Sequence, residues 1–389
     1  MCDWLSSAPI SLFEWDVGTR QRVATSGVER AKMVEKTEFG TLPSGETAHV
    51  FTLKAGDITV RVSDFGATVL GIEVPDAQGN IADVVLGHKD LAGYAGPNDA
   101  FYGATVAPVA NRTAGGEIPV GVKTYQLPKN DHEANNLHTD KDHGLHKRLW
   151  TEDYAAETDH SATLQLSYHL DSGDLYLPGS RLVTARFTVS APATLTIAYQ
   201  METDRPTFAN ITNHSYFNLA GHASGDVRAQ TMQIRADRFV CIDEASIPTG
   251  ELREVDLTPF DFHEAHALGD QIDADYDQIA NARGYDHCFV IDGYEPDAAP
   301  RLAMRAEDPA SGRVMEVYLT TPGVQLYTGN WLGDADGKDG ASYGQNDGFA
   351  IEPEFYPDCV HHEDWPQPRV TASHPFKSVI EYEFSTVER

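Results

Sequence analysis

The sequence predicts an all-β fold, a large antiparallel β-sandwich with few short helices. Hydrophobic residues alternate with polar ones in many segments, and this period of two is typical of strands with one buried face. Clusters of Gly, Pro, Asn and Asp separate the segments, and long helical periodicity is nearly absent. The clearest alternating sets are Ile58–Val62, Leu164–Leu170, Leu195–Met201, Met315–Leu319 and Ile380–Phe384, and short helices are expected near Gly27–Lys36 and within Ala274–Arg283.

A single domain is expected to cover residues 37–389. The chain has 389 residues, of which 41% are hydrophobic, and this is enough to bury a large core. From Phe39 onward no linker, repeat or low-complexity segment interrupts the chain. Residues 1–36 differ, because Trp4, Phe13 and Trp15 are scattered through a polar background. We interpret them as an N-terminal extension that is partly ordered against the core.

Composition and charge exclude several classes of partner. The formal net charge is −30 and the sequence pI is about 4.7, so nucleic acid and anionic membrane surfaces are poor partners. No run approaches the roughly 18 apolar residues of a membrane helix, and the N-terminus lacks the basic and apolar regions of a signal peptide. The four cysteines are far apart and form no C-x-x-C pair. We therefore expect reduced thiols in a cytoplasmic protein.

Five stretches of the chain are dense in polar and aromatic side chains, although they lie far apart in sequence. They are VANRTAGG (109–116), NNLHTDKDHG (135–144), NITNHSYFNLAG (210–221), GYDHCFV (284–290), and PGVQLYTGN with EPEFYPD (322–330 and 352–358). Glycosylation sequons begin at Asn111, Asn210 and Asn213, but without a signal peptide we expect these amides to satisfy turns or line a pocket. No H-E-x-x-H, phosphate-loop or G-x-S-x-G motif occurs, so no protein-bound metal, nucleotide or serine-hydrolase site is predicted.

The remaining chemistry is acid–base catalysis by a histidine and a carboxylate. A histidine titrates near pH 6.5 and can give a proton at neutral pH, and a glutamate can take one. Arg, Asn, Gln and aromatic side chains around such a pair suit a neutral ligand with many hydroxyl groups. Amides and carboxylates engage the hydroxyl groups, and aromatic faces cover the C–H surfaces of the ligand.

The same stretches resemble motifs of the aldose 1-epimerase (galactose mutarotase) family from about Phe39 to the C-terminus. NITNHSYFNLAG is similar to the family's N-L-T-N-H-S-Y-F-N-L-A-G signature. DFGATVLGIEVPD (64–76), ADVVLGHKDLAGY (82–94), PTGELREVDLTPFDF (248–262), PGVQLYTGNWL (322–332) and IEPEFYPD (351–358) match further motifs in the family's order. The resemblance implies a galactose mutarotase-like supersandwich. It also implies an isomerase that interconverts the α and β anomers of free aldoses, such as galactose or glucose, without a cofactor.

The resemblance also implies roles for individual residues. His214 matches the family's general acid, and Glu352 matches its general base. The substrate-binding positions that it implies are Asn111, Arg112, His138, Tyr216, Asp286 and Gln325. The expected partner is therefore a small-molecule monosaccharide, bound by a protein that is a monomer or a homodimer.

Some positions depart from the family's pattern. Arg112 is followed by Thr-Ala-Gly-Gly-Glu-Ile where the family usually has G-G-R-F nearby, and Leu137 begins L-H-T-D where it has L-H-G-G. Glu354 stands where the family commonly has Gln. On a strand Glu352 and Glu354 share a face, so the second carboxyl is expected to raise the pKa of the first or to bind a hydroxyl group.

Three alternative functions stay open at this point. A hexose-phosphate mutarotase on the same fold would need several cations for the phosphate. A sugar-binding protein could keep the fold without turnover. A carbohydrate lyase or hydrolase with a similar sandwich is the third, and a hydrolase would need two carboxylates at a defined separation.

Overall fold

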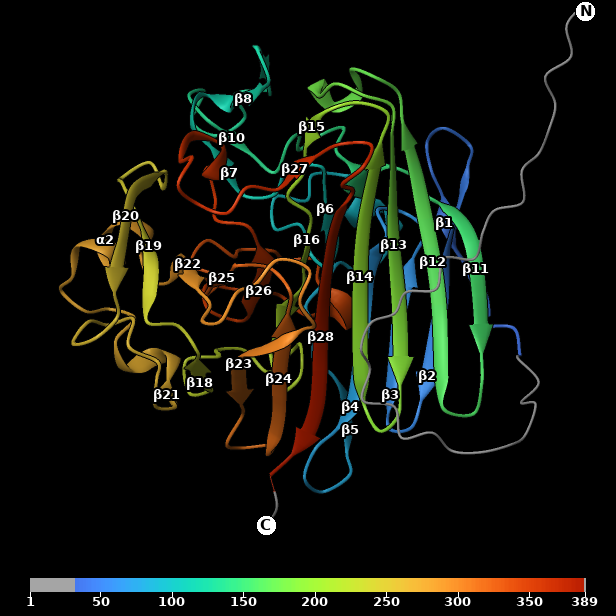
Figure 1. Cartoon of the computed structure of the whole chain (residues 1–389). Helices are drawn as coiled ribbons and strands as arrows, with labels where there is room; N and C mark the ends of the chain where they lie inside the picture. The colour runs from blue at the N-terminus through green and yellow to red at the C-terminus, as the bar shows by residue number, and fades with distance from the viewer. Residues whose placement is uncertain (1–31, 388–389) are drawn as a thin grey trace, which may run out of the picture.

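The computed structural model describes residues 32–387, which fold into antiparallel sheets (Figure 1). Within these residues the largest sheet has nine strands, in the order β11 (Thr151–Glu157), β12 (Ser161–Leu170), β13 (Arg181–Ser190), β14 (Thr194–Thr203), β28 (Phe376–Thr386), β24 (Arg313–Leu319), β23 (Arg301–Glu307), β18 (Thr231–Ile234) and β21 (His266–Ala267). A five-stranded sheet has the order β1 (Glu35–Thr41), β2 (Thr47–Ala55), β3 (Ile58–Ser63), β4 (Thr68–Pro75) and β5 (Ile81–Asp83).

A third sheet and several short ladders complete the described part of the fold. The third sheet has six strands, in the order β17 (Tyr216–Phe217), β26 (Phe349–Glu354), β25 (Gly323–Tyr327), β22 (Asp286–Val290), β19 (Arg238–Ile242) and β20 (Pro248–Glu254). The ladders pair β16 (Thr212–His214) with β6 (Ala104–Val106), β7 (Arg112–Thr113) with β10 (Asn136–Leu137), β8 (Glu117–Val120) with β9 (Lys123–Gln126), and β15 (Thr207–Phe208) with β27 (Arg369–Val370). Residues 32–387 contain two α-helices, α1 (Leu91–Ala95) and α2 (Asp277–Ala282).

The core lies between the five-stranded and nine-stranded sheets. Strands β2 and β3 pack against β12 and β13, and Figure 1 shows the two sheets as layers. Phe51 and Val60 from one sheet and Leu164 and Phe187 from the other are fully buried in one continuous hydrophobic cluster. The exposure pattern of β13 alternates along the strand, as the period of two predicts. The predicted all-β fold class is confirmed.

Most of the elements predicted from periodicity are present. The five alternating sets form β3, β12, β14, β24 and β28, and the helix expected within Ala274–Arg283 is α2. The helix expected near Gly27–Lys36 is wrong in its described part, because Lys32 pairs with Glu157 and β1 begins at Glu35. The part of that segment that belongs to β1 pairs with strand β2, and this pairing overrides the weak helical pattern. Residues 1–31 of the expected N-terminal extension lie outside the described residues.

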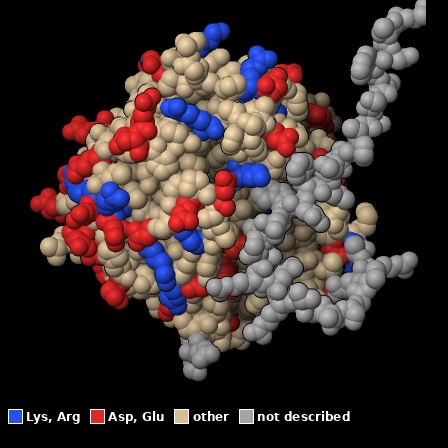
Figure 2. Space-filling model, in the orientation of Figure 1, with Lys and Arg blue, Asp and Glu red and all other residues tan. Residues whose placement is uncertain are grey.

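The surface of the described chain carries the strong negative charge of the sequence. Figure 2 shows acidic side chains spread over one face, with basic side chains interspersed. Neither helix of residues 32–387 has the length and the apolar run that a bilayer crossing demands.

Asn210 joins two segments that come from different parts of the chain. Its side-chain amide donates to the Phe355 carbonyl over 3.0 Å, and its side-chain oxygen accepts from the Phe355 N–H over 2.9 Å. Its backbone N–H donates to Pro108, and its carbonyl accepts from Ala110. The end of β26 is therefore tied to residues 108–110. Asn213 is likewise buried and donates to the Gly103 carbonyl, so the expectation that these amides satisfy backbone groups is confirmed.

Replacing Asn210 with Ala should destabilise the fold. The substitution leaves the Phe355 N–H and carbonyl without their partners in a partly buried place, so we expect a loss of about 2 kcal/mol in the free energy of unfolding. Chemical denaturation followed by circular dichroism measures it. Asn80→Ala, in an exposed turn, is the control, with an expected change below about 0.5 kcal/mol. Equal stability of the two variants would mean that Asn210 contributes nothing to the junction.

Candidate active site

Neighbouring strands bring the polar stretches of the sequence to one place. Glu352 lies on β26 directly opposite Gln325 on β25, and Asp286 begins β22, the next strand of the same sheet. His214 ends β16, and this strand packs beside β26. Because residues two apart on a strand share a face, the register fixes which carboxylates and amides point toward His214.

His214 and Glu352 form a buried acid–base pair. The distance from His214 Nε2 to Glu352 Oε1 is 3.5 Å, and their side chains are 6% and 3% exposed. Among the described residues, neither His214 Nδ1 nor Glu352 Oε2 has a hydrogen-bond partner. Burial lowers the pKa of His214 to about 4 and raises the pKa of Glu352 well above its usual range. Burial therefore favours the uncharged form of both groups.

Arg112 is held beside the pair by two carboxylates. Its Nε donates to Asp131 over 3.2 Å, and an Nη nitrogen lies 3.4 Å from Asp286. Gln325 donates its amide to the other oxygen of Asp286 over 2.6 Å, and Gln325 Oε1 has no partner within the described residues. A small hollow beside these three side chains is closed by the β19–β20 hairpin. This corner offers both donors and acceptors to hydroxyl groups.

His138 approaches His214 from a different loop. Their ring centroids are 5.2 Å apart, and His138 is buried. The backbone N–H of Asn111 donates to His138 Nδ1 over 3.1 Å. Burial keeps the pKa of His138 well below its ordinary value, so the ring is neutral and carries its proton on Nε2. Both Asn111 and His138 have positive φ angles, 59° and 54°, in the region that Asn tolerates better than most residues.

Aromatic rings form one wall of the cluster. The Tyr216 ring lies 5.1 Å from the His214 ring, and the Tyr327 ring lies 5.9 Å from Tyr216. Phe101 contacts the rings of both His138 and His214, with centroids 4.7 and 6.0 Å away. These rings exclude water from the imidazoles, which is why burial dominates the pKa of each histidine.

The structure brings together all eight site residues that the sequence predicted. They are His214, Glu352, Asn111, Arg112, His138, Tyr216, Asp286 and Gln325. Phe101, Asp131 and Tyr327 also contact members of this cluster, although sequence reasoning did not select them. Tyr327 lies within the PGVQLYTGN stretch and could have been selected for that reason. Phe101 and Asp131 lie in ordinary turn sequence and carry no comparable signal.

Within residues 32–387, two groups of side chains have a geometry that could hold a metal ion. His138, His214 and Glu352 each offer one ligand atom within 4.8 Å of the others, and all three are buried. Asp256, Asp261 and His263 form a similar but more exposed group. The first group includes both members of the His214–Glu352 pair, so a metal bound there would occupy the atoms through which the two side chains approach each other.

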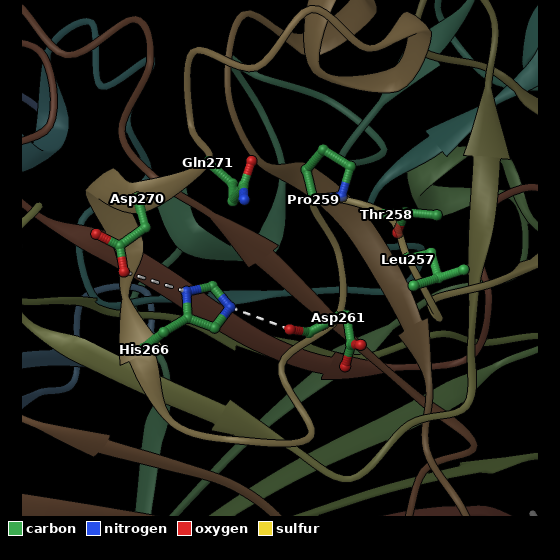
Figure 3. A pocket seen from close by; sticks show the side chains of 7 residues that line it. All are labelled: Leu257, Thr258, Pro259, Asp261, His266, Asp270 and Gln271. Carbon is green, nitrogen blue, oxygen red and sulfur yellow. Dashed lines mark hydrogen bonds and ion pairs between the residues drawn. The ribbon is translucent and has the colours of Figure 1, made fainter.

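A larger hollow, of about 510 Å³, shares no lining residue with the cluster. Figure 3 shows His266 between Asp270 and Asp261 in this hollow. His266 Nε2 lies 3.0 Å from the Asp261 carbonyl oxygen, and Nδ1 lies 3.9 Å from an Asp270 carboxylate oxygen. The hollow therefore offers no buried acid–base pair, and we place the chemistry at His214 and Glu352 instead.

Comparisons with known proteins agree with this geometry. The sequence model of the aldose 1-epimerase family matches residues 49–383. Galactose mutarotase of Rattus norvegicus is 36% identical over 354 residues, which cover 90% of this chain and 98% of that protein. Aldose 1-epimerase of Escherichia coli (strain K12) is 32% identical over 346 residues, covering 88% and 96%.

Solved structures show the same relationship. The crystal structure of the GalM/aldose epimerase homologue from C. elegans superimposes with a TM-score of 0.77 and 26% identity, covering 92% of this chain and 100% of that one. The predicted fold, family and isomerase activity are thereby confirmed. The chain belongs to the aldose 1-epimerase family.

Proposed function

We propose that this protein interconverts the anomers of free aldoses such as galactose or glucose, with Glu352 as general base and His214 as general acid. The observation that carries the proposal is the buried pair itself, with 3.5 Å between Nε2 and Oε1. Opening a hemiacetal ring requires an acid and a base at the two oxygens of one carbon. Because several relatives are named galactose mutarotase, galactose is the first substrate to test.

The proposed reaction opens and recloses the sugar ring. Glu352 removes the proton of the anomeric hydroxyl group on C1 while His214 donates a proton to the ring oxygen O5. The C1–O5 bond breaks, its electron pair stays on O5, and the open-chain aldehyde forms. Rotation about the C1–C2 bond turns the other face of the carbonyl toward O5. The O5 hydroxyl group then attacks C1 and returns its proton to His214, and Glu352 returns its proton to O1.

The electrostatics of the pair suit the middle of this cycle. Ring opening starts only after the shared proton has moved from Glu352 to His214, which makes a carboxylate and an imidazolium. With the open chain bound, both groups are neutral, and this is the state that burial favours. The total number of protons on the pair stays at one throughout. The site therefore favours the proton arrangement that accompanies the aldehyde.

The other predicted residues supply binding and orientation in this proposal. Asp286, Gln325 and Arg112 form a connected corner with donors and acceptors for ring hydroxyl groups. His138 carries its proton on Nε2 and can donate to a sugar oxygen. The buried Tyr216 ring covers a C–H face of the sugar. Each of these contacts orients C1 and O5 between the acid and the base.

The contacts of Arg112 disfavour the phosphate alternative. A sugar phosphate needs cations that are free to bind it, whereas Arg112 is engaged by Asp131 and Asp286. Both carboxylates would also repel the phosphate. The buried pairing of His214 with Glu352 favours turnover over simple sugar binding, because a binding protein has no use for an acid next to a base in a dry site.

Removing either member of the pair should nearly abolish activity. A positioned acid or base contributes roughly 10²–10⁴-fold to the rate, so we expect kcat for galactose to fall by that factor in His214→Asn and in Glu352→Gln. Polarimetry of freshly dissolved α-galactose, corrected for the rate in buffer, measures the change. His160→Asn and Glu383→Gln, both at exposed positions, are the matched controls. Full activity in either site variant would show that the catalytic assignment is wrong.

The pH dependence should follow the single proton of the pair. Below about pH 4, His214 gains a proton while Glu352 keeps its own, so no base remains and kcat/KM falls. On the high-pH side, once the pH exceeds the raised pKa of Glu352, the proton is lost and kcat/KM falls. We expect a plateau between these limits in polarimetric assays, with circular dichroism confirming folding at each pH. An acid limb near pH 6.5 would instead indicate a histidine in contact with water.

A further inference from the structure

Glu354 is a second buried carboxyl group next to the acid–base pair. It ends β26, two residues after Glu352, so both side chains point to the same face of the sheet. The side chain is fully buried, and Oε1 accepts a hydrogen bond from the Asn111 amide over 2.8 Å. Oε2 is buried without a hydrogen-bond partner among the described residues.

No cation of the described chain neutralises Glu354 directly. Within residues 32–387 no Lys, Arg or His nitrogen forms an ion pair with it, and Arg112 is already engaged by two aspartates. The titratable and charged groups that face it are Glu352 of its own strand, Asp286 and Cys288 of β22, Arg112 of β7, and Cys359 of the 3₁₀ turn Cys359–His361. Two adjacent buried carboxyl groups in such surroundings do not both carry a charge.

Asn111 transmits the contact with Glu354 to the binding residues. Its side-chain oxygen accepts the Arg112 backbone N–H over 2.7 Å. Its backbone N–H donates to His138 Nδ1, and its carbonyl accepts the His138 N–H over 3.1 Å. The φ angle of 59° at Asn111 is a conformation that neighbouring contacts must hold. The Glu354 carboxyl therefore holds the Asn111 side chain, which also accepts from the Arg112 backbone N–H, while the backbone of Asn111 holds His138.

We propose that Glu354 is a positioning residue that acts as a neutral carboxylic acid, holding Asn111 while Glu352 alone changes charge in turnover. The inference rests on the proposed acid–base function. An ionised Glu354 would raise the pKa of Glu352, so a smaller fraction of Glu352 would be the carboxylate that the proposed reaction needs. Burial and the neighbouring Glu352 both raise the pKa of Glu354, in agreement with a protonated group. The neutral acid still offers Asn111 an acceptor oxygen.

Substitutions at Glu354 separate the acceptor from the charge. Glu354→Gln keeps an acceptor oxygen and cannot ionise, so we expect kcat/KM within about threefold of the parent and both limbs of the pH profile unmoved. Glu354→Leu removes the acceptor and leaves the Asn111 amide unpaired, so we expect KM for galactose to rise roughly tenfold or more, with a smaller effect on kcat. Glu383→Gln, at an exposed position of β28, is the control for both variants.

The alkaline limb decides the charge of Glu354. If Glu354 were ionised in the native protein, Glu354→Gln would remove a negative charge beside Glu352, and the alkaline limb would move to lower pH by about one unit or more. That shift would overturn the inference. Equal KM for the Gln and Leu variants would overturn the positioning role. If the Leu variant does not fold, the Gln variant still tests the charge.

Infrared spectroscopy tests the protonated state without turnover. In the Glu352→Gln background, the spectrum should contain a protonated-carboxyl band that disappears when Glu354→Gln is added. Absence of this band from the spectrum of the Glu352→Gln variant would overturn the inference. The same background separates the two proposals: activity in Glu352→Gln would refute the proposed function, whereas an inactive Glu352→Gln with a shifted Glu354→Gln profile would refute only the role of Glu354.

Discussion

The burial of His214 against Glu352 is the constraint on which the rest of the structure depends. A buried imidazolium or carboxylate is costly unless a partner lies close by, and the two side chains come from strands more than a hundred residues apart. Only a fixed register between β16, β26 and their neighbours keeps the two atoms at 3.5 Å. The large hydrophobic core supplies the rigidity for that register, because packed sheets shift little without losing their interior contacts.

Buried asparagine side chains connect chain segments around the His214–Glu352 pair. Asn210 bonds to both backbone groups of Phe355, and Asn218 bonds to the carbonyls of Gly225 and Asp347. An amide side chain has two donors and an acceptor oxygen, so it can replace a missing strand neighbour where chain segments meet without regular pairing. The density of asparagine in NITNHSYFNLAG thus has a structural cause. His214 is held in a dry site by neighbours that satisfy the surrounding backbone.

Sequence reasoning predicted the fold well because its signals are local. Period-two alternation marked strands such as Ser161–Leu170, where each residue's exposure follows from its own position. The pattern failed at Glu35, where pairing with β2 decides the structure. The site motifs selected the two residues that we propose as acid and base, but Phe101 and Asp131 act through tertiary contacts that leave no local pattern. Glu354 was recognisable as a second carboxyl, yet its partner Asn111 lies 243 positions away along the chain.

The charges around the pair bear on how this site would favour the ring opening that we propose. A free Arg112 would stabilise the charged forms of Glu352 and Glu354. Its guanidinium group is instead paired with Asp131 and Asp286. Arg112 therefore offsets the effect of burial on Glu352 only in part, and burial raises the pKa of this carboxyl. In the proposed reaction, ring opening starts with charge separated between Glu352 and His214, whereas the open-chain form leaves both groups neutral. By this mechanism, the same dry surroundings that make each isolated charge unfavourable would lower the free energy of the aldehyde stage relative to the charge-separated ring complex.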